Sequence, residues 1–225
     1  MQAADSFTSK MPLAATEPKP DCKLCPRLVK LRRKMQSEHP NWWNAPVPAW
    51  GDPDAWLAII GLAPGMKGAN RTGRAFTGDA SGDLLFATLD KVELSSGVFA
   101  SHIDDGVALN GCIILNSVKC LPPENKPTLN EANNCRRFLT AQLADLAKLK
   151  IFIALGKIAH DSFIRHVDGK LADYKFGHLA EHRLPDGRIL IDSYHCSRYN
   201  TQTGRLTPEM FEAVFERAKA FKNQP

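Results

Sequence analysis

The sequence has no apolar run long enough to cross a membrane, so we expect no transmembrane helix. The first sixteen residues also lack the cationic start and apolar core of a secretory signal. We therefore expect a cytoplasmic protein without a membrane partner. In that reducing compartment, the six cysteines are expected to be thiols or metal ligands and not disulfides.

Neither sign of charge dominates the chain. It has 29 Lys and Arg against 24 Asp and Glu, a net charge of +5. This mild excess is compatible with a polyanionic partner but does not identify one. The 44% hydrophobic content supports a sizeable core, and no internal repeat is visible. We expect residues 1–20, which are polar and rich in proline, to form a disordered tail, and residues 21–225 to form a single domain.

Short apolar runs alternate with helical patterns along the chain. The runs predict four buried strands at 56–60, 111–116, 151–155 and 188–192. Helices are predicted after Pro26, over 79–91, over 131–147 with Asn130 as cap, over 157–166, and after Thr207. Residues 95–110 are expected to be a loop. Together these elements predict a three-layer α/β/α fold with a central, mainly parallel, four-stranded sheet.

The stretch 61–79 directly follows the first predicted strand. Its nineteen residues include five glycines and one proline, so we expect a loop without regular structure. Open α/β sheets bind their ligands at the carboxyl ends of parallel strands. Glycine amides, arginines and an aromatic ring in this loop suit a flat, phosphate-linked substrate. The alternative is a plain surface loop, which would have no need of Phe76 between Gly73-Arg74 and Thr77-Gly78.

Two more polar clusters follow predicted strands. One spans 116–120 and the other spans 195–205. Three such clusters at one edge of a sheet predict one composite site.

Four cysteines form two pairs that are far apart in the sequence. They are Cys22, Cys25, Cys120 and Cys135. Four thiolates from two segments suit either a [4Fe–4S] cluster or a structural zinc ion, and the spacing does not choose between them. Four unrelated thiols are the remaining alternative. Cys112 is expected to be a core residue, and Cys196 has no partner at ligand spacing.

Several segments jointly resemble one known family. They are Cys22-Lys-Leu-Cys25-Pro-Arg-Leu-Val, 47–52, Gly61-Leu-Ala-Pro64, 68–79, 116–127, Asn134-Cys135 and 195–207. The sequence resembles the uracil-DNA glycosylase superfamily, and most closely its family 5, the iron–sulfur type. The resemblance covers roughly residues 20 to 222.

The resemblance implies a monofunctional DNA repair glycosylase. Such an enzyme flips out uracil, and other deaminated bases such as hypoxanthine and xanthine, and hydrolyses the N-glycosidic bond to start base excision repair. The resemblance also implies a structural [4Fe–4S] cluster on the four cysteines, DNA containing deaminated bases as the partner, and action as a monomer.

The sequence departs from the family pattern at two places. Relatives usually have a small residue, often alanine, at the position of Gly65, and other families hold the water with an acidic or amide side chain nearby. Relatives commonly have His-Pro-Ser where this chain has His195-Cys196-Ser197. The role of holding the water must therefore move to another side chain.

The extruded base needs a stacking surface and contacts at its edge. Phe76 is our candidate for stacking, with an ordinary core phenylalanine as the alternative. Asn116, at the end of a predicted strand, offers both an acceptor and a donor to a uracil edge. The backbone amides of Leu62 or Ala63 are expected to complete the recognition.

Cleavage develops negative charge on the departing base. His195 is expected to stabilise that charge, with Asn200 as a supporting amide. Asp79 is the only carboxylate in the 61–79 loop and is our candidate for activating water. Its alternative role is to cap the following helix, and both roles are compatible.

DNA binding requires cations for phosphates and a means of flipping the base. Arg71, Arg74 and Arg205 are our candidates, together with the basic helix over 27–34. A solvated charged face is the alternative for that helix. Two other functions stay open: a damaged-DNA binding protein without catalysis, and a nucleotide-binding module with a structural zinc ion.

Overall fold

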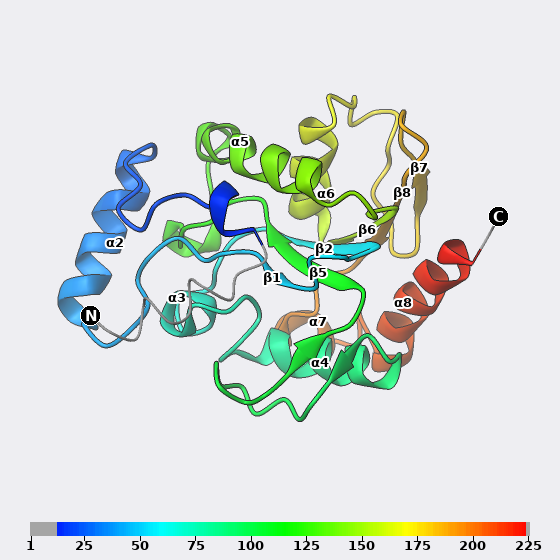
Figure 1. Ribbon diagram of the computed structural model, residues 1–225, viewed down its shortest axis with the longest axis horizontal. Helices are drawn as coiled ribbons and strands as arrows, with labels where there is room; N and C mark the ends of the chain where they lie inside the picture. The colour runs from blue at the N-terminus through cyan, green and yellow to red at the C-terminus, as the bar shows by residue number, and fades with distance from the viewer. Residues whose placement is uncertain (1–12, 224–225) are drawn as a thin grey trace.

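A six-stranded sheet forms the centre of the computed structural model, which describes residues 13–223 (Figure 1). The strand order is β1-β5-β2-β6-β8-β7. The four inner strands run parallel, and the two edge strands are antiparallel to their neighbours. Their bounds are β1 Trp50–Gly51, β2 Leu57–Gly61, β5 Cys112–Asn116, β6 Ile151–Leu155, β7 Glu181–Arg183 and β8 Ile189–Ser193.

The inner strands coincide with the four predicted ones, and every residue in them is buried. Such strands are apolar without alternation because helices cover both faces of a parallel sheet. The sheet has six strands where we predicted four. The two additional edge strands are only two and three residues long, and β7 is polar. Neither produces an apolar run that sequence reasoning could detect.

Helices form the two outer layers. Their bounds are α2 Pro26–Glu38, α3 Ala69–Thr72, α4 Ala80–Lys91, α5 Leu129–Asp145, α6 Lys157–His166, α7 Arg198–Gln202 and α8 Pro208–Lys222, with short 3-10 turns η1 Ala14–Thr16 and η2 Pro123–Asn125. Helices α4 and α8 contribute to the hydrophobic cluster on one face of the sheet, and α5 and α6 to the cluster on the other. The three-layer α/β/α prediction is therefore confirmed.

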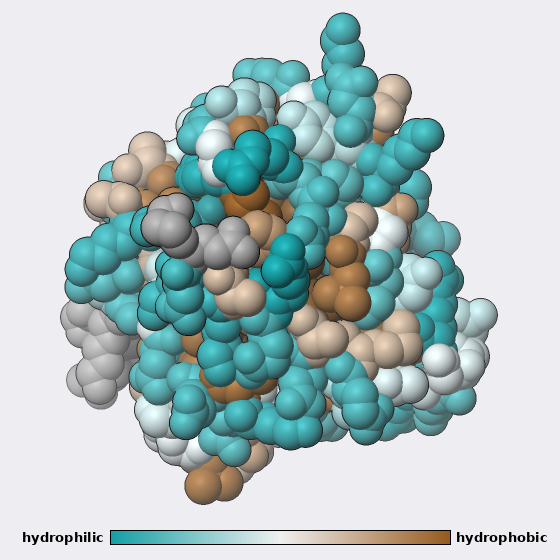
Figure 2. All heavy atoms as spheres, turned by 90° about the vertical axis from the view of Figure 1, so that its right-hand side faces the viewer, coloured by the Kyte–Doolittle hydropathy of each residue, from teal (hydrophilic) through white to brown (hydrophobic). Residues whose placement is uncertain are grey.

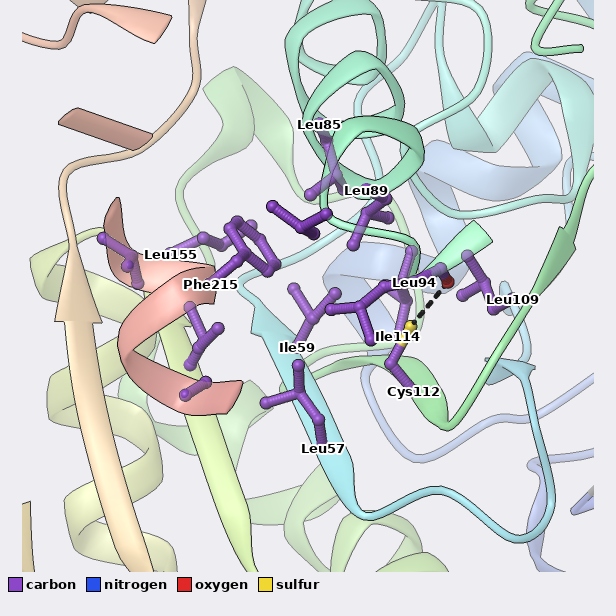
Figure 3. Close-up of a cluster of buried hydrophobic side chains, with 14 of the residues drawn as sticks. Leu57, Ile59, Leu85, Leu89, Leu94, Leu109, Cys112, Ile114, Leu155 and Phe215 are labelled. Atoms are coloured by element: carbon purple, nitrogen blue, oxygen red, sulfur yellow. Dashed lines mark hydrogen bonds between the residues drawn. The ribbon is translucent and has the colours of Figure 1, made fainter. Parts of the chain in front are cut away.

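Figure 3 shows the first of these clusters. Leu57 and Ile59 of β2 belong to one cluster with Phe215 of α8 and with Leu85 and Leu89 of α4. Cys112 of β5 belongs to the same cluster, and its thiol donates to the carbonyl oxygen of Leu94 at 3.4 Å. The expectation that Cys112 is a core residue is confirmed.

Three local predictions need correction. Helix α5 is capped by Thr128 and not by Asn130, because Thr128 and Glu131 exchange the two hydrogen bonds of a capping box. The 61–79 loop contains the short helix α3. The predicted loop over 95–110 contains a small hairpin of β3 (Ser95–Ser96) and β4 (Ala108–Leu109).

The amino-terminal segment is more ordered than we expected over its described part. Leu13 is buried in the second hydrophobic cluster. Glu17 accepts a hydrogen bond from the Ala49 amide at 2.6 Å. The expectation of a disordered tail is therefore wrong for residues 13–20, and its remainder, 1–12, lies outside the described residues.

Within residues 13–223, none of the helices has the length and apolar character that a bilayer crossing requires. Figure 2 shows the face that carries β7 and the end of α8, where hydrophilic side chains predominate and apolar ones are scattered.

Candidate active site

A cavity of about 430 Å³ lies at the carboxyl ends of β2, β5, β6 and β8. It is lined by the loop after β2, the end of β5, the start of α6 and the segment after β8. Six of the predicted site residues line it: Leu62, Ala63, Phe76, Asp79, Asn116 and His195. The structure thus brings all three polar clusters to one place.

Gly61 allows the two candidate base-binding side chains to approach one another. A Cβ at this position would overlap the Asn116 Oδ1 and would lie 3.2 Å from the Phe76 ring. Phe76 has a φ of +53°, a left-handed conformation that is rare for a bulky residue. Such strain is concentrated at functional sites. The Phe76 ring centre lies 6.3 Å from that of His195, so ring, amide and imidazole border the same space.

Asp79 uses its two carboxylate oxygens differently. Oδ1 accepts a hydrogen bond from the Ser81 amide at 3.0 Å and caps α4. Oδ2 is directed at the loop glycines, since a Cβ on Gly68 would overlap it and one on Gly65 would lie 3.1 Å from it. The capping role is confirmed, and Oδ2 lies beside Gly65, which lines the cavity together with Asp79.

His195 is half-buried at the cavity wall. Burial lowers the pKa of its imidazole, and the negative charge of Asp79 opposes this only in part. The ring is therefore neutral at pH 7 and carries one N–H donor. Gly156, with a φ of +92°, gives it room, because a Cβ there would lie 3.2 Å from the His195 Cβ.

Asn200 does not line the cavity. Its Nδ2 donates to the carbonyl oxygen of His195 at 2.8 Å, so it holds the backbone that carries the imidazole. This contact fits the supporting role that we expected of Asn200, which it would play through the backbone of His195. Cys196, next to His195, is completely buried in the first hydrophobic cluster, and burial raises its pKa to about 12.

The prediction that Arg74 binds DNA is wrong. Its side chain is only 2% exposed and forms a two-pronged ion pair with Asp105, at 2.7 and 2.8 Å. Its guanidinium also lies 4.8 Å from the ring centre of Trp50. Burial alone would raise the pKa of Asp105, but the hydrogen bonds from Arg74 and two backbone amides hold it far below its ordinary value. Arg74 therefore anchors the loop from within.

Arg71 and Arg205 are exposed, and their contact with DNA stays a prediction. Arg71 donates to the carbonyl oxygens of Lys67 at 2.8 Å and of Gly78 at 3.3 Å, which ties the loop together. The guanidinium of Arg205 lies 4.5 Å from the ring centre of Tyr194.

Sequence reasoning missed part of the cavity wall. The missed polar residues are Ser81, Asn125, Lys157 and Ser197. Lys157 follows β6 directly and forms an ion pair with Asp161 at 2.7 Å. Gly156 and Lys157, which follow the 151–155 strand, could have indicated a fourth polar cluster at this edge of the sheet.

The four predicted metal-binding cysteines surround one small cavity between α2 and α5. Three polar groups are directed at their sulfurs. Arg32 Nη1 lies 3.9 Å from the Cys120 Sγ, and the Lys119 amide lies 3.5 Å from the Cys135 Sγ. Asn134 Nδ2 lies 3.6 Å from the Cys25 Sγ.

This donor set fits a metal centre held by four thiolates. Burial, together with the neighbouring thiols, raises the pKa of Cys120 to about 12 and that of Cys135 to about 11. Thiolates in this position need a bound cation, and N–H donors to sulfur are typical of iron–sulfur and zinc centres. Among the described residues, however, no three of the four sulfurs lie within 4.8 Å of one another. A tetrahedral zinc ion with Zn–S bonds of about 2.3 Å holds its sulfurs roughly 3.8 Å apart, so the spacing favours the larger [4Fe–4S] cluster.

A parallel sheet with a polar cavity at its strand ends and a four-cysteine centre beside it defines the class of this protein. The chain belongs to the uracil DNA glycosylase superfamily, whose family model matches residues 48–219.

Within that superfamily the chain is similar to type-5 uracil-DNA glycosylases. It is 45% identical over 203 residues to that of Thermus thermophilus, covering 88% of this chain and 92% of the relative. It is 38% identical over 204 residues to that of Pyrobaculum aerophilum, covering 89% and 88%. A type-4 uracil-DNA glycosylase of Thermotoga maritima is 34% identical but covers only 53% of each chain. Another type-4 enzyme, from Sulfurisphaera tokodaii, covers 76% of this chain but is only 28% identical, so the likeness to type 5 is the stronger one in sequence identity.

Proposed function

We propose that this protein is a uracil-DNA glycosylase that hydrolyses the N-glycosidic bond of uracil in DNA and so begins base excision repair. The observation that carries this proposal is one cavity where Phe76, Asn116, Asp79 and a neutral His195 converge. The relatives named type-5 uracil-DNA glycosylase support the substrate.

The cavity residues divide the reaction between them. A base in a duplex is out of reach until the nucleotide is flipped into the cavity. There Phe76 stacks on the ring and Asn116 hydrogen-bonds its edge. The neutral His195 donates a hydrogen bond to the base as negative charge develops during bond breakage. The Oδ2 of Asp79 accepts from the attacking water and orients it toward the sugar carbon.

Cys22, Cys25, Cys120 and Cys135 would hold a [4Fe–4S] cluster. When bound, the cluster supplies a cross-link and not reaction chemistry, since four protein ligands leave no open position. It would join the start of α2 to the loop over 120–127. Asn125 of that loop lines the active-site cavity, so the cross-link reaches the site.

The proposal includes hypoxanthine and xanthine as further substrates. The cavity volume of about 430 Å³ supports this range, because it falls among those of ordinary small-molecule sites and is not confined to one small ring. We further propose that the enzyme acts as a monomer in the cytoplasm, where its DNA substrate is found.

The deciding experiment is base excision by the purified protein. Duplexes with a single uracil, hypoxanthine or xanthine are incubated with it, and abasic sites are detected by alkaline cleavage. We expect strand cleavage at the modified base. Tight binding without cleavage, unchanged in His195→Ala, would instead identify a damaged-DNA binding protein. A preference for mononucleotides over DNA would identify a nucleotide-binding module.

A further inference from the structure

A second cavity lies directly beside the active site. Its volume is about 180 Å³, and it is enclosed by the start of α5, one side of α6 and the segment after β5. Leu62 and Ile158 line both cavities, so they form the wall between them. Asn116 lines the active site, whereas its neighbour Ser117 lines the second cavity. The two sites therefore lie on either side of one strand end.

Two arginines give this cavity a positive charge. Arg136 of α5 donates to Asn133 Oδ1 at 2.8 Å, and Arg165 of α6 donates to the carbonyl oxygen of Asp161 at 3.3 Å. Over residues 13–223, neither guanidinium forms an ion pair. His166 also lines the cavity, and burial first, then the charges of Arg136 and Arg188, lower its pKa to about 4. The neutral imidazole leaves the arginines as the charged groups of the cavity.

Ser117 supplies an unused hydrogen-bonding group. It is 3% exposed, and its hydroxyl has no partner among the described residues. A buried polar group without a partner is costly unless a ligand or water satisfies it. The rim is apolar, with Leu129 57% and Ile158 56% exposed. The guanidiniums without an ion-pair partner match a phosphate, and the buried hydroxyl matches a sugar or phosphate oxygen. The apolar rim matches the carbon face of the sugar.

We propose that this second cavity binds the sugar–phosphate of the nucleotide next to the flipped one on the same DNA strand. The proposal rests on the glycosylase function proposed above. Its volume is less than half that of the active site, which suits part of a nucleotide and not a second flipped base. Arg136 and Arg165 bind the phosphate, and Ser117 hydrogen-bonds an oxygen of the same unit.

Replacing single phosphates of the DNA by uncharged groups tests whether the second cavity binds a phosphate. Each linkage near the uracil is replaced in turn by an uncharged methylphosphonate, on a duplex whose 2′-fluorinated deoxyuridine resists cleavage, and Kd is measured by fluorescence anisotropy. For the natural protein we expect weaker binding at one flanking linkage. The double variant Arg136→Gln/Arg165→Gln should lose that linkage-specific effect. Its log Kd should also depend less steeply on log salt, by about 0.9 for one phosphate on duplex DNA.

Arg137→Gln is the matched control. Arg137 lies on the same helix as Arg136, and its substitution removes one positive charge where the double variant removes two, but Arg137 does not line the cavity. It should keep the natural linkage profile and salt dependence. Identical profiles in the double variant and the control would overturn the proposal. Loss of the glycosylase function is a separate outcome, because uracil release by the natural protein is measured on unmodified DNA.

Ser117→Ala separates binding from folding. Removing an unpartnered buried hydroxyl should leave the melting temperature unchanged or raise it. Binding should nevertheless weaken by about two- to tenfold, the range of one neutral hydrogen bond. A lower melting temperature with unchanged Kd would show that the hydroxyl serves the fold alone.

Discussion

The two oxygens of Asp79 allow its two roles to be separated by substitution. Asp79→Asn keeps an oxygen that can accept from the Ser81 amide but removes the charge from the cavity. We expect excision to slow by about 10²-fold, at the low end for a lost acid–base group, with little change in stability. Asp79→Ala should slow excision by the same factor. It should also lower the free energy of unfolding by about 1 kcal/mol, the usual contribution of a helix cap.

Single-turnover rates and urea denaturation of both Asp79 variants make the comparison. If Asp79→Asn excised uracil at the natural rate while Asp79→Ala was less stable, the role of Asp79 would be limited to capping α4. Asp83, in the first turn of α4, provides the control. The substitution Asp83→Asn removes a nearby charge without touching the cap or the residues that line the cavity.

His195 sets the pH dependence at the residue scale. Because burial lowers its pKa below 6.5, the neutral ring that donates to the base persists through pH 7. We expect kcat to be flat above pH 6.5 and to fall only in more acidic solution. His195→Gln should lower kcat by about 10²- to 10³-fold. It should also remove the acid limb of the pH–rate profile, meaning the decrease of kcat at acidic pH that protonation of the imidazole causes. An identical acid limb in the variant would assign it to another group.

Prediction at the residue scale depended on how local each cause was. Asp79 could be identified because its loop and the helix after it are adjacent in the sequence. Arg74 could not, because its partner Asp105 lies thirty-one residues further along the chain. The sequence alone does not distinguish an arginine that becomes buried in an ion pair from one that binds phosphate.

At the scale of elements, a buried polar network joins α6, β7 and β8. Asp192 of β8 is fully buried and contacts His160 Nδ1 at 2.7 Å and His182 Nε2 at 3.0 Å. The other nitrogen of His160 lies 2.9 Å from the carbonyl oxygen of Tyr174. Both partners of His160 are acceptors, so both of its nitrogens carry protons and the ring is cationic.

This network predicts that stability falls as the pH rises. Burial lowers the pKa of His160, but the hydrogen bond and charge of Asp192 and the Tyr174 carbonyl outweigh it, so the net shift is upward from 6.5. A raised pKa in the folded state stabilises fully below pH 6.5 and is lost as pH rises through the folded value. Urea denaturation between pH 6 and 9 should show this decline.

His160→Gln supplies the comparison for the network. It should be less stable at pH 6, and the part of the pH dependence that belongs to His160 should be absent. An unaltered pH dependence in this variant would assign the decline to other groups. Such a network was beyond sequence reasoning, because His160, His182 and Asp192 come from three separate elements.

The elements themselves were predictable to the extent that burial marks them. Each inner strand begins with an unbroken run of at least three apolar residues, so all four were found. The edge strands and the hairpin of β3 and β4 have only two or three residues each, and pairing with neighbours alone creates them. The cap of α5 depends on a choice between Thr128 and Asn130, which only the reciprocal bond from Glu131 decides.

At the scale of the whole molecule, the proposed metal centre would join cysteines from segments about a hundred residues apart. Cys22 and Cys25 precede α2, whereas Cys120 and Cys135 belong to the segment after β5 and to α5. The two segments are otherwise held by contacts such as the ion pair of Arg27 with Glu131 at 2.7 Å. In this pair Arg27 donates two hydrogen bonds to the buried Glu131, so it contributes more than an exposed ion pair would. A bound metal centre would add a cross-link to it and should dominate the connection.

Removal of one ligand should therefore lower stability and activity together. Anaerobically prepared protein is expected to be brown, and Cys22→Ala should bleach it, lower the melting temperature and weaken excision, because the loop that carries Asn125 loses its anchor. Cys112→Ala is the control: its thiol lies in the core, away from the four-cysteine cavity, so the colour should persist. Iron and zinc analysis accompanies the spectra. Colourless protein with one zinc ion would replace the cluster by a zinc centre, and unchanged stability in Cys22→Ala would contradict the cross-link itself.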